Sequence, residues 1–140
     1  LFPTNYDGLA SGLLAAIRSI SGEELVDSVF EERRRLAGER LHDRLAERLA
    51  PDAPVTERAR ELAVIQDEQG YLAEAVVGVD GVLRLVERNC AIHRVVAGHA
   101  VACQAELDLF RELLGTDVQR ETHIAAGDRC CTYRIGGATD

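Results

Sequence analysis

Cysteine and histidine are the residues of this sequence whose chemistry stands out, and they gather in its C-terminal third. Of the four cysteines and four histidines, only His42 lies outside this region. The others are Cys90, Cys103, Cys130, Cys131, His93, His99 and His123. Thiolates and imidazoles are ligands for soft and borderline metal ions, so this region is the candidate site. No paired carboxylates stand out from the general acidic background.

The pattern around the cysteines predicts where each one points. Cys103 belongs to an apolar stripe with helical spacing and should face the interior. Cys131 begins a segment in which alternate residues are apolar, so it should lie on the buried face of a strand. Cys90 ends a strand-like segment, which lets all three converge at one end of a sheet. Cys130 should face away from Cys131, because successive strand residues alternate.

Three interpretations of these thiols stay open. Each cysteine can be a small buried hydrophobic residue, which is common for free cysteine. A disulfide is the second possibility, which the lack of a secretory signal disfavours. A thiolate site for a soft metal or an iron–sulfur cluster is the third. Twelve residues separate Cys90 from Cys103, and no Cys-x2-Cys pair is present, so the spacing suits a cluster that bridges several elements better than a zinc finger.

The first half of the chain predicts helices. Apolar residues at helical spacing predict one over about 6–19. A Ser-x-x-Glu capping box at Ser21 and Glu24 predicts the start of a long polar helix that ends before the prolines. A third helix fits 56–69, with Thr56 as its N-cap. The long helix is either a solvated helix lying on the domain or a dimerisation arm.

The second half of the chain changes to strand-like patterns around one helix. Asp-Gly and Gly-Asp dipeptides join the strands of each pair, which indicates two hairpins. The segments cover, in chain order, 71–79, 82–88, 97–114, 118–126 and 131–135. Two strands, a helix and two strands predict a β-β-α-β-β antiparallel sheet unit with one face covered, so the expected fold class is α+β. Residues 136–140 are expected to form a flexible tail.

Composition and charge limit the possible partners. With 46% hydrophobic and 29% charged residues, the chain is typical of a soluble globular domain. No apolar run is long enough for a membrane span, and the start is not a signal peptide, so we expect a cytoplasmic protein. The net charge of −8 opposes nucleic acid binding by these 140 residues. Methionine is absent, which suggests that an N-terminal part is missing.

A set of spaced motifs in the second half points to one family. They are Asn-Cys-Ala-Ile at 89–92, Cys103, Glu-Leu at 106–107 with Phe110, the segment 118–123, and Gly-Asp-Arg-Cys-Cys-Thr-Tyr at 127–133. Together they resemble the C-terminal half of the SufR-type iron–sulfur repressors, winged-helix regulators of cluster-assembly operons. The resemblance covers about residues 53–135, and the first fifty residues fit it only loosely.

The resemblance implies a cluster site and a missing DNA-binding domain. In that family an N-terminal winged helix-turn-helix binds DNA, and the C-terminal half holds the cluster and the dimer contacts. The resemblance places Cys90, Cys103 and Cys131 at three of the family's four cysteine positions, and Asp117 at the fourth. The cluster is expected to be 4Fe-4S or 2Fe-2S. Candidates for its fourth ligand are Asp117, His123, Cys130 and His99, or an exogenous thiol or water.

The resulting prediction is a redox sensor and dimerisation region of a transcriptional repressor. Residues 1–52 form a helical dimerisation and connecting region, and 53–135 form an α+β iron–sulfur sensor domain. Cluster occupancy controls operator binding by a homodimer through the missing domain, with no membrane partner. The alternative is a small-molecule-binding regulatory module that uses the cysteines as core residues and holds no cluster. We do not expect an enzyme, because no base–nucleophile pair can be named.

Overall fold

Helices fill the first half of the chain, and a four-stranded antiparallel sheet follows, which confirms the predicted α+β class. The computed structural model describes residues 2–136. Its elements are α1 (Tyr6–Ser21), α2 (Glu23–Arg48), α3 (Val55–Glu68), β1 (Ala73–Val77), β2 (Leu83–Glu87), α4 (His93–Val96), α5 (Ala100–Leu114), β3 (Val118–Thr122), the 3-10 helix η1 (Ile124–Ala126) and β4 (Cys131–Ile135). Among residues 2–136, no helix is both long enough and apolar enough to pass through a membrane.

The sheet has the strand order β1-β2-β4-β3, with every neighbouring pair antiparallel. The two predicted hairpins therefore form and join through β2 and β4 in the middle. In the register of that central pair, Glu87 lies opposite Cys131 and Leu85 lies opposite Tyr133. Since directly opposed residues point to the same face, all four side chains lie on one side of the sheet.

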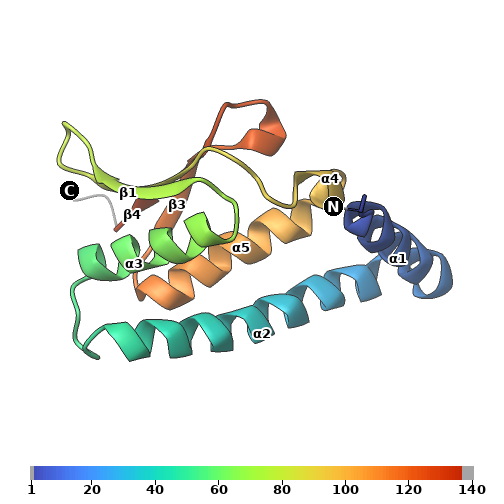
Figure 1. Cartoon of the computed structure of the whole chain (residues 1–140), viewed down its shortest axis with the longest axis horizontal. Helices are drawn as coiled ribbons and strands as arrows, with labels where there is room; N and C mark the ends of the chain where they lie inside the picture. The colour runs from blue at the N-terminus through green and yellow to red at the C-terminus, as the bar shows by residue number, and fades with distance from the viewer. Residues whose placement is uncertain (1, 137–140) are drawn as a thin grey trace.

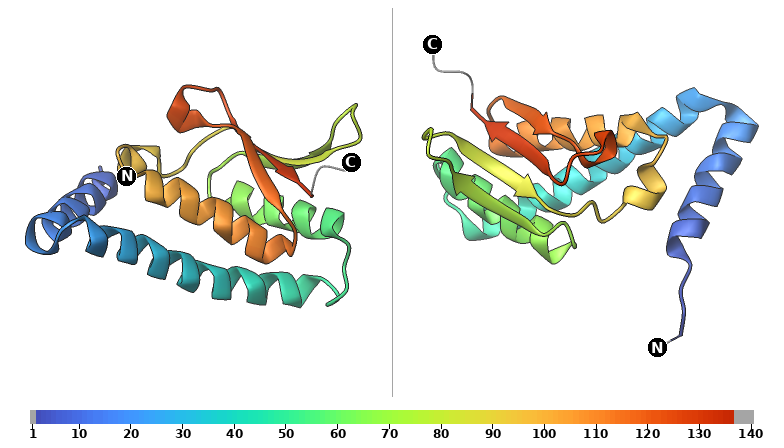
Figure 2. Two further views of the ribbon diagram at one scale, coloured as in Figure 1. Left: turned by 180° about the vertical axis from the view of Figure 1, so that it is seen from behind. Right: turned by 90° about the horizontal axis from the view of Figure 1, so that it is seen from above.

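Three layers build the body of the molecule. One face of the sheet is covered by α3 and α5, and α2 lies on the far side of these two helices (Figure 1). The shorter helix α1 crosses the N-terminal end of α2 and contacts α4 (Figure 2). The segment between β2 and α5 is thus held between the sheet and the α1–α2 pair.

The long helix α2 is polar on its surface but has a buried side that packs against α5. Ion pairs at i,i+3 and i,i+4 spacing, such as those of Arg35 with Glu32 and Glu39, support its exposed face. At Gly38 the two helices approach closely, because an added Cβ would lie 3.3 Å from a Leu109 methyl carbon. Within this chain, α2 therefore lies along the domain.

Several predicted boundaries are wrong, and turns explain why. The capping box does not form: Ser21 is the last residue of α1, and Gly22, at φ +84°, turns the chain into α2. Thr56 lies inside α3, because Pro54 takes the N-cap position. The helix predicted from residue 97 is divided into α4 and α5. Of the predicted tail, 137–140 lie outside the described residues.

Candidate functional site

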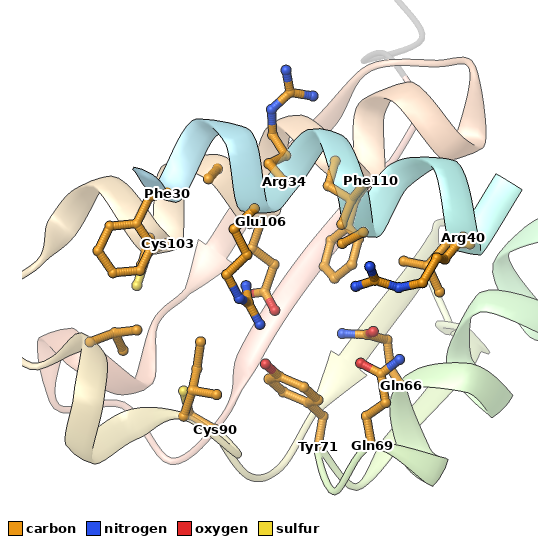
Figure 3. Close-up of a pocket in the computed structure, with 18 of the residues that line it drawn as sticks. Phe30, Arg34, Arg40, Gln66, Gln69, Tyr71, Cys90, Cys103, Glu106 and Phe110 are labelled. Atoms are coloured by element: carbon orange, nitrogen blue, oxygen red, sulfur yellow. The ribbon is translucent and has the colours of Figure 1, made fainter. Parts of the chain in front are cut away.

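A cavity of about 340 Å³ lies between α2, α5 and the segments around Tyr71 and Cys90. Figure 3 shows Cys90 and Cys103 at one end and Arg40 at the other, with Glu106 between them. Two of the predicted site residues, which come from a loop and from α5, therefore share one cavity. The third, Cys131, does not line it.

Cys90 and Cys103 are both partly buried at the cysteine end of this cavity. Cys90 follows β2, and Cys103 lies in the first turns of α5, where its carbonyl accepts a 2.6 Å hydrogen bond from Arg120 Nη2. Burial raises the pKa of both thiols, and the negative charge of Glu106 raises them further. In the cluster-free protein these thiols are held in their neutral form.

Cys131 faces the helices from the start of β4, as its alternation with Tyr133 predicts. Its sulfur accepts a hydrogen bond from the backbone N–H of Ile124 at 3.3 Å. Burial raises the pKa of this thiol, and the carboxyl of Glu87 on the opposing strand raises it further. The neighbouring Cys103 thiol has its own pKa raised by Cys131, so the two lie within electrostatic range of each other.

Cys130 points elsewhere, as the strand alternation predicts. Its sulfur lies 3.5 Å from the Thr132 hydroxyl and 3.8 Å from the Thr122 hydroxyl. Thr132 belongs to the opposite side of β4 from Cys131, since successive strand residues alternate. The structure therefore places Cys90 and Cys103 in one cavity and Cys131 within electrostatic range of Cys103, and it leaves Cys130 on the other side of β4.

The remaining fourth-ligand candidates lie in different places. His123 lies between β3 and η1, next to Ile124, and its Nε2 is buried with no hydrogen-bond partner among residues 2–136. His99 contacts the Phe30 ring, with centroids 5.6 Å apart. Asp117 lies beyond the C-terminal end of α5, separated from Cys103 by roughly 16 Å of helix at 1.5 Å per residue.

One buried carboxyl group, Glu87, and one partly buried one, Glu106, belong to the site, although the sequence interpretation named neither as a site residue. Glu87 is 2% exposed, and it accepts a 2.9 Å hydrogen bond from Gln66. Glu106 accepts one of 2.9 Å from the Tyr133 hydroxyl. Desolvation raises the pKa of both groups, in Glu87 to about 9. The signal was available, because Glu106 lies one helical turn after Cys103, on the same stripe.

Arg120 is a cation that interacts electrostatically with this group of thiols and acids. Its guanidinium lies 5.3 Å from the centre of the Tyr133 ring, and its Nε is buried without a hydrogen-bond partner within residues 2–136. It opposes the effect of burial on Cys103 and favours the thiolate form. A site with three thiols and one adjacent guanidinium can therefore accommodate part of the negative charge that thiolates would bring.

No match to this chain is found among protein-family models or curated proteins. Membership of a family is therefore not assigned, and the resemblance to the SufR-type repressors stays a prediction from motifs. Function has to be inferred from the cavity and the side chains around it.

Proposed function

We propose that this chain is the sensor and dimerisation region of an iron–sulfur-dependent transcriptional repressor of the cytoplasm. Cys90, Cys103 and Cys131 would hold the cluster, and operator DNA would be bound through a winged helix-turn-helix outside this chain. The observation that carries the proposal is that Cys90, after β2, and Cys103, at the start of α5, line one cavity, and that Cys131, at the start of β4, raises the pKa of Cys103.

The donor set suits a cluster better than a single ion. In the described part of the chain, no three Cys, His, Asp or Glu side chains meet closely enough to hold one metal ion. A polynuclear cluster does not require this, because different cysteines ligate different irons. The unpartnered Nε2 of His123 supports this residue as the fourth ligand, and histidine does replace cysteine in natural clusters. The position of Asp117 disfavours the carboxylate.

The three cysteines connect the site to the helices that would carry a DNA-binding domain. Cys90 precedes α4, which contacts α1, and Cys103 belongs to α5, which packs along α2. Fixing these thiols relative to Cys131 therefore fixes α4 and α5 relative to the sheet. When bound, a cluster supplies a group that oxidants or a shortage of iron can remove. Its removal would free these elements and change how α1 and α2 are held, so repression would be lost.

Reconstitution of the chain under anaerobic conditions tests the proposal. Incubation with ferrous iron and sulfide is expected to give a brown protein with visible thiolate-to-iron absorbance and bound acid-labile sulfide. Iron and sulfide are then measured per chain after desalting. A colourless protein without bound sulfide would exclude the cluster and leave the cysteines as lining residues of the cavity.

An apolar stripe on α1 supports the homodimer. Leu9 and Leu13 are more than half exposed, and Tyr6 and Ile20 lie on the same side of the helix. We expect Leu13→Glu to convert a dimer into a monomer, because a charge would be buried in the contact. Sedimentation velocity measures the change.

Ser19→Glu is the matched control for this dimer test, since Ser19 is exposed and lies about 120° round α1 from Leu13, outside the stripe. It should leave the dimer intact. A parent chain that sediments as a monomer, or equal loss of the dimer in both variants, would contradict the assignment of the contact to this stripe.

A further inference from the structure

The cavity next to the cysteines has a cationic wall, in a chain whose net charge is −8. Four arginines of α2 line it: Arg33, Arg34, Arg40 and Arg44. Arg34 and Arg44 are neutralised by ion pairs with acidic side chains of α5 and α3, each at 2.7 Å. Among residues 2–136, Arg33 and Arg40 have no carboxylate within ion-pair distance. Among these residues, Arg40 is therefore left without an acidic partner, and Arg33 interacts with Glu106 electrostatically without forming an ion pair.

A buried phenol lies across the cavity from this wall. Tyr71 is only 7% exposed, and its hydroxyl points into the cavity towards Glu106 (Figure 3). Within the described residues it makes no side-chain hydrogen bond, and it is not among the fully buried polar atoms that lack a partner, so the hydroxyl is open to the cavity. Burial raises the pKa of Tyr71, so the hydroxyl keeps its proton and can donate it in a hydrogen bond. Two guanidinium groups and one hydroxyl thus line one cavity, in which Glu106 interacts electrostatically with Arg33 and Tyr71.

Glu106, the acid inside the cavity, already has a partner. Its carboxyl accepts the hydrogen bond of the Tyr133 hydroxyl. Arg34 points away from the cavity, whereas the guanidinium of Arg40 extends into it towards Gln66 (Figure 3). Arg40 therefore lies at the α2–α3 end, away from Cys90 and Cys103, whereas Arg33 lies within electrostatic range of Glu106.

The other walls are apolar, and the size suits a small molecule. The apolar residues are Phe30, Leu41, Ile92, Val96, Leu109 and Phe110. A volume of about 340 Å³ lies at the lower end of the range of small-molecule sites, which is roughly 300–1,000 Å³. A ligand with one anionic group and a compact apolar body could interact with the arginines through the first and pack against the apolar residues with the second.

We propose that this cavity binds a small organic acid. Its oxyanion group, a carboxylate or a phosphate, is held by Arg33, Arg40 and the Tyr71 hydroxyl, because guanidinium groups match both in geometry. Its apolar body contacts Phe30 and Phe110. This ligand goes beyond the proposed cluster and does not require it. Since it would connect α2 with the segment before β1, bound acid would hold α2 against the sheet layer.

Calorimetry and thermal denaturation of the purified cluster-free chain test the proposal. The probes are short aliphatic and aromatic monocarboxylates, the phosphate monoesters of the matching alcohols, and the matching neutral amides, all at constant ionic strength. At least one acid series is expected to bind saturably at up to millimolar concentration and to raise the Tm, and the amides are not. The series that binds more tightly identifies the anion.

Variants assign the site. Arg33→Gln and Arg40→Gln should each weaken binding by about tenfold, since one charge-assisted hydrogen bond contributes on this scale. Tyr71→Phe, which removes only the hydroxyl, should weaken it less. Arg35→Gln is the control, because Arg35 lies on the exposed face of the same helix and carries the same charge. Its affinity should equal that of the parent.

Three results would overturn the proposal. One is the absence of saturable binding by every acid, and another is equal stabilisation by acids and amides. The third is an equal loss of affinity in Arg35→Gln and Arg40→Gln, which would indicate attraction by net charge alone. The Cys90→Ser/Cys103→Ser double variant separates this proposal from the cluster. Acid binding should survive in it, whatever the outcome of reconstitution.

Discussion

Serine at Cys90, Cys103 or Cys131 is expected to abolish stable cluster binding, whereas serine at Cys130 should leave most of it. The hydroxyl is a hard and weak ligand where iron requires a soft thiolate. We expect Cys130 not to be a ligand, because its sulfur lies against the hydroxyls of Thr122 and Thr132 and not beside the other thiols. Iron, sulfide and visible absorbance are measured for each variant after the same anaerobic reconstitution.

Two controls make the serine series interpretable. Circular dichroism of the cluster-free variants checks that each one folds, which is expected because Cys and Ser differ little in size. Asp117→Cys adds a thiol beyond the far end of α5 and should leave the rate of cluster loss in air unchanged. Equal loss of cluster at all four cysteines would show that β4 does not separate Cys130 from Cys131.

Glu87→Gln is expected to stabilise the cluster-free protein at alkaline pH and to change it little at pH 5. Burial raises the pKa of Glu87 to about 9, well above its value in the unfolded chain. Between these two pKa values the unfolded state releases the proton and the folded state keeps it. The free energy of unfolding of the parent therefore falls as pH rises from about 4.5 to about 9, and it does not depend on this group below that window.

The substitution removes this titration and keeps the contact. Glutamine offers the same oxygen to the Gln66 amide, which now donates to Glu87 at 2.9 Å. Each pKa unit corresponds to about 1.4 kcal/mol. Because Glu87 titrates together with neighbouring acids, one substitution removes only part of the effect. We expect the free energy of unfolding of the variant to exceed that of the parent by roughly 1–3 kcal/mol at pH 8. Urea denaturation of parent and variant at pH 5 and pH 8 measures this gain.

Glu74→Gln is the matched control for the pH experiment. Glu74 lies on the adjacent strand β1 and is exposed, where it forms an ion pair with Arg88. The same chemical change should have little effect on unfolding at either pH, because exposed ion pairs contribute little. If Glu87→Gln followed the pH profile of the parent, Glu87 would be ionised in the folded protein.

The elements around the cysteines were predictable because their patterns are local. On α5, apolar residues recur every three or four positions, and on β4 alternate residues are apolar, so Cys103 and Cys131 could each be oriented. The pairing of the strands into two hairpins followed from their short connections. These inferences need only the neighbours of a residue along the chain.

Helix boundaries were less predictable, because local signals compete there. Ser21 and Glu24 have capping-box spacing, yet α1 continues through Ser21 until Gly22 allows the turn. Where the chain turns depends on how α1 packs across α2 and α4, and such packing is not encoded within a few residues.

Periodicity and spacing in the sequence determined the α+β order of elements, the inward direction of Cys103 and Cys131, and the outward direction of Cys130. Only the tertiary structure decided that Arg33 and Arg40 of α2 share a cavity with Tyr71, and that Glu87 lies opposite Cys131. The physical reason is that burial of a charged side chain depends on segments far away in the chain. From the sequence alone, an acidic or basic residue on an amphipathic element is predicted to be exposed. Only the tertiary structure shows which other segments cover it.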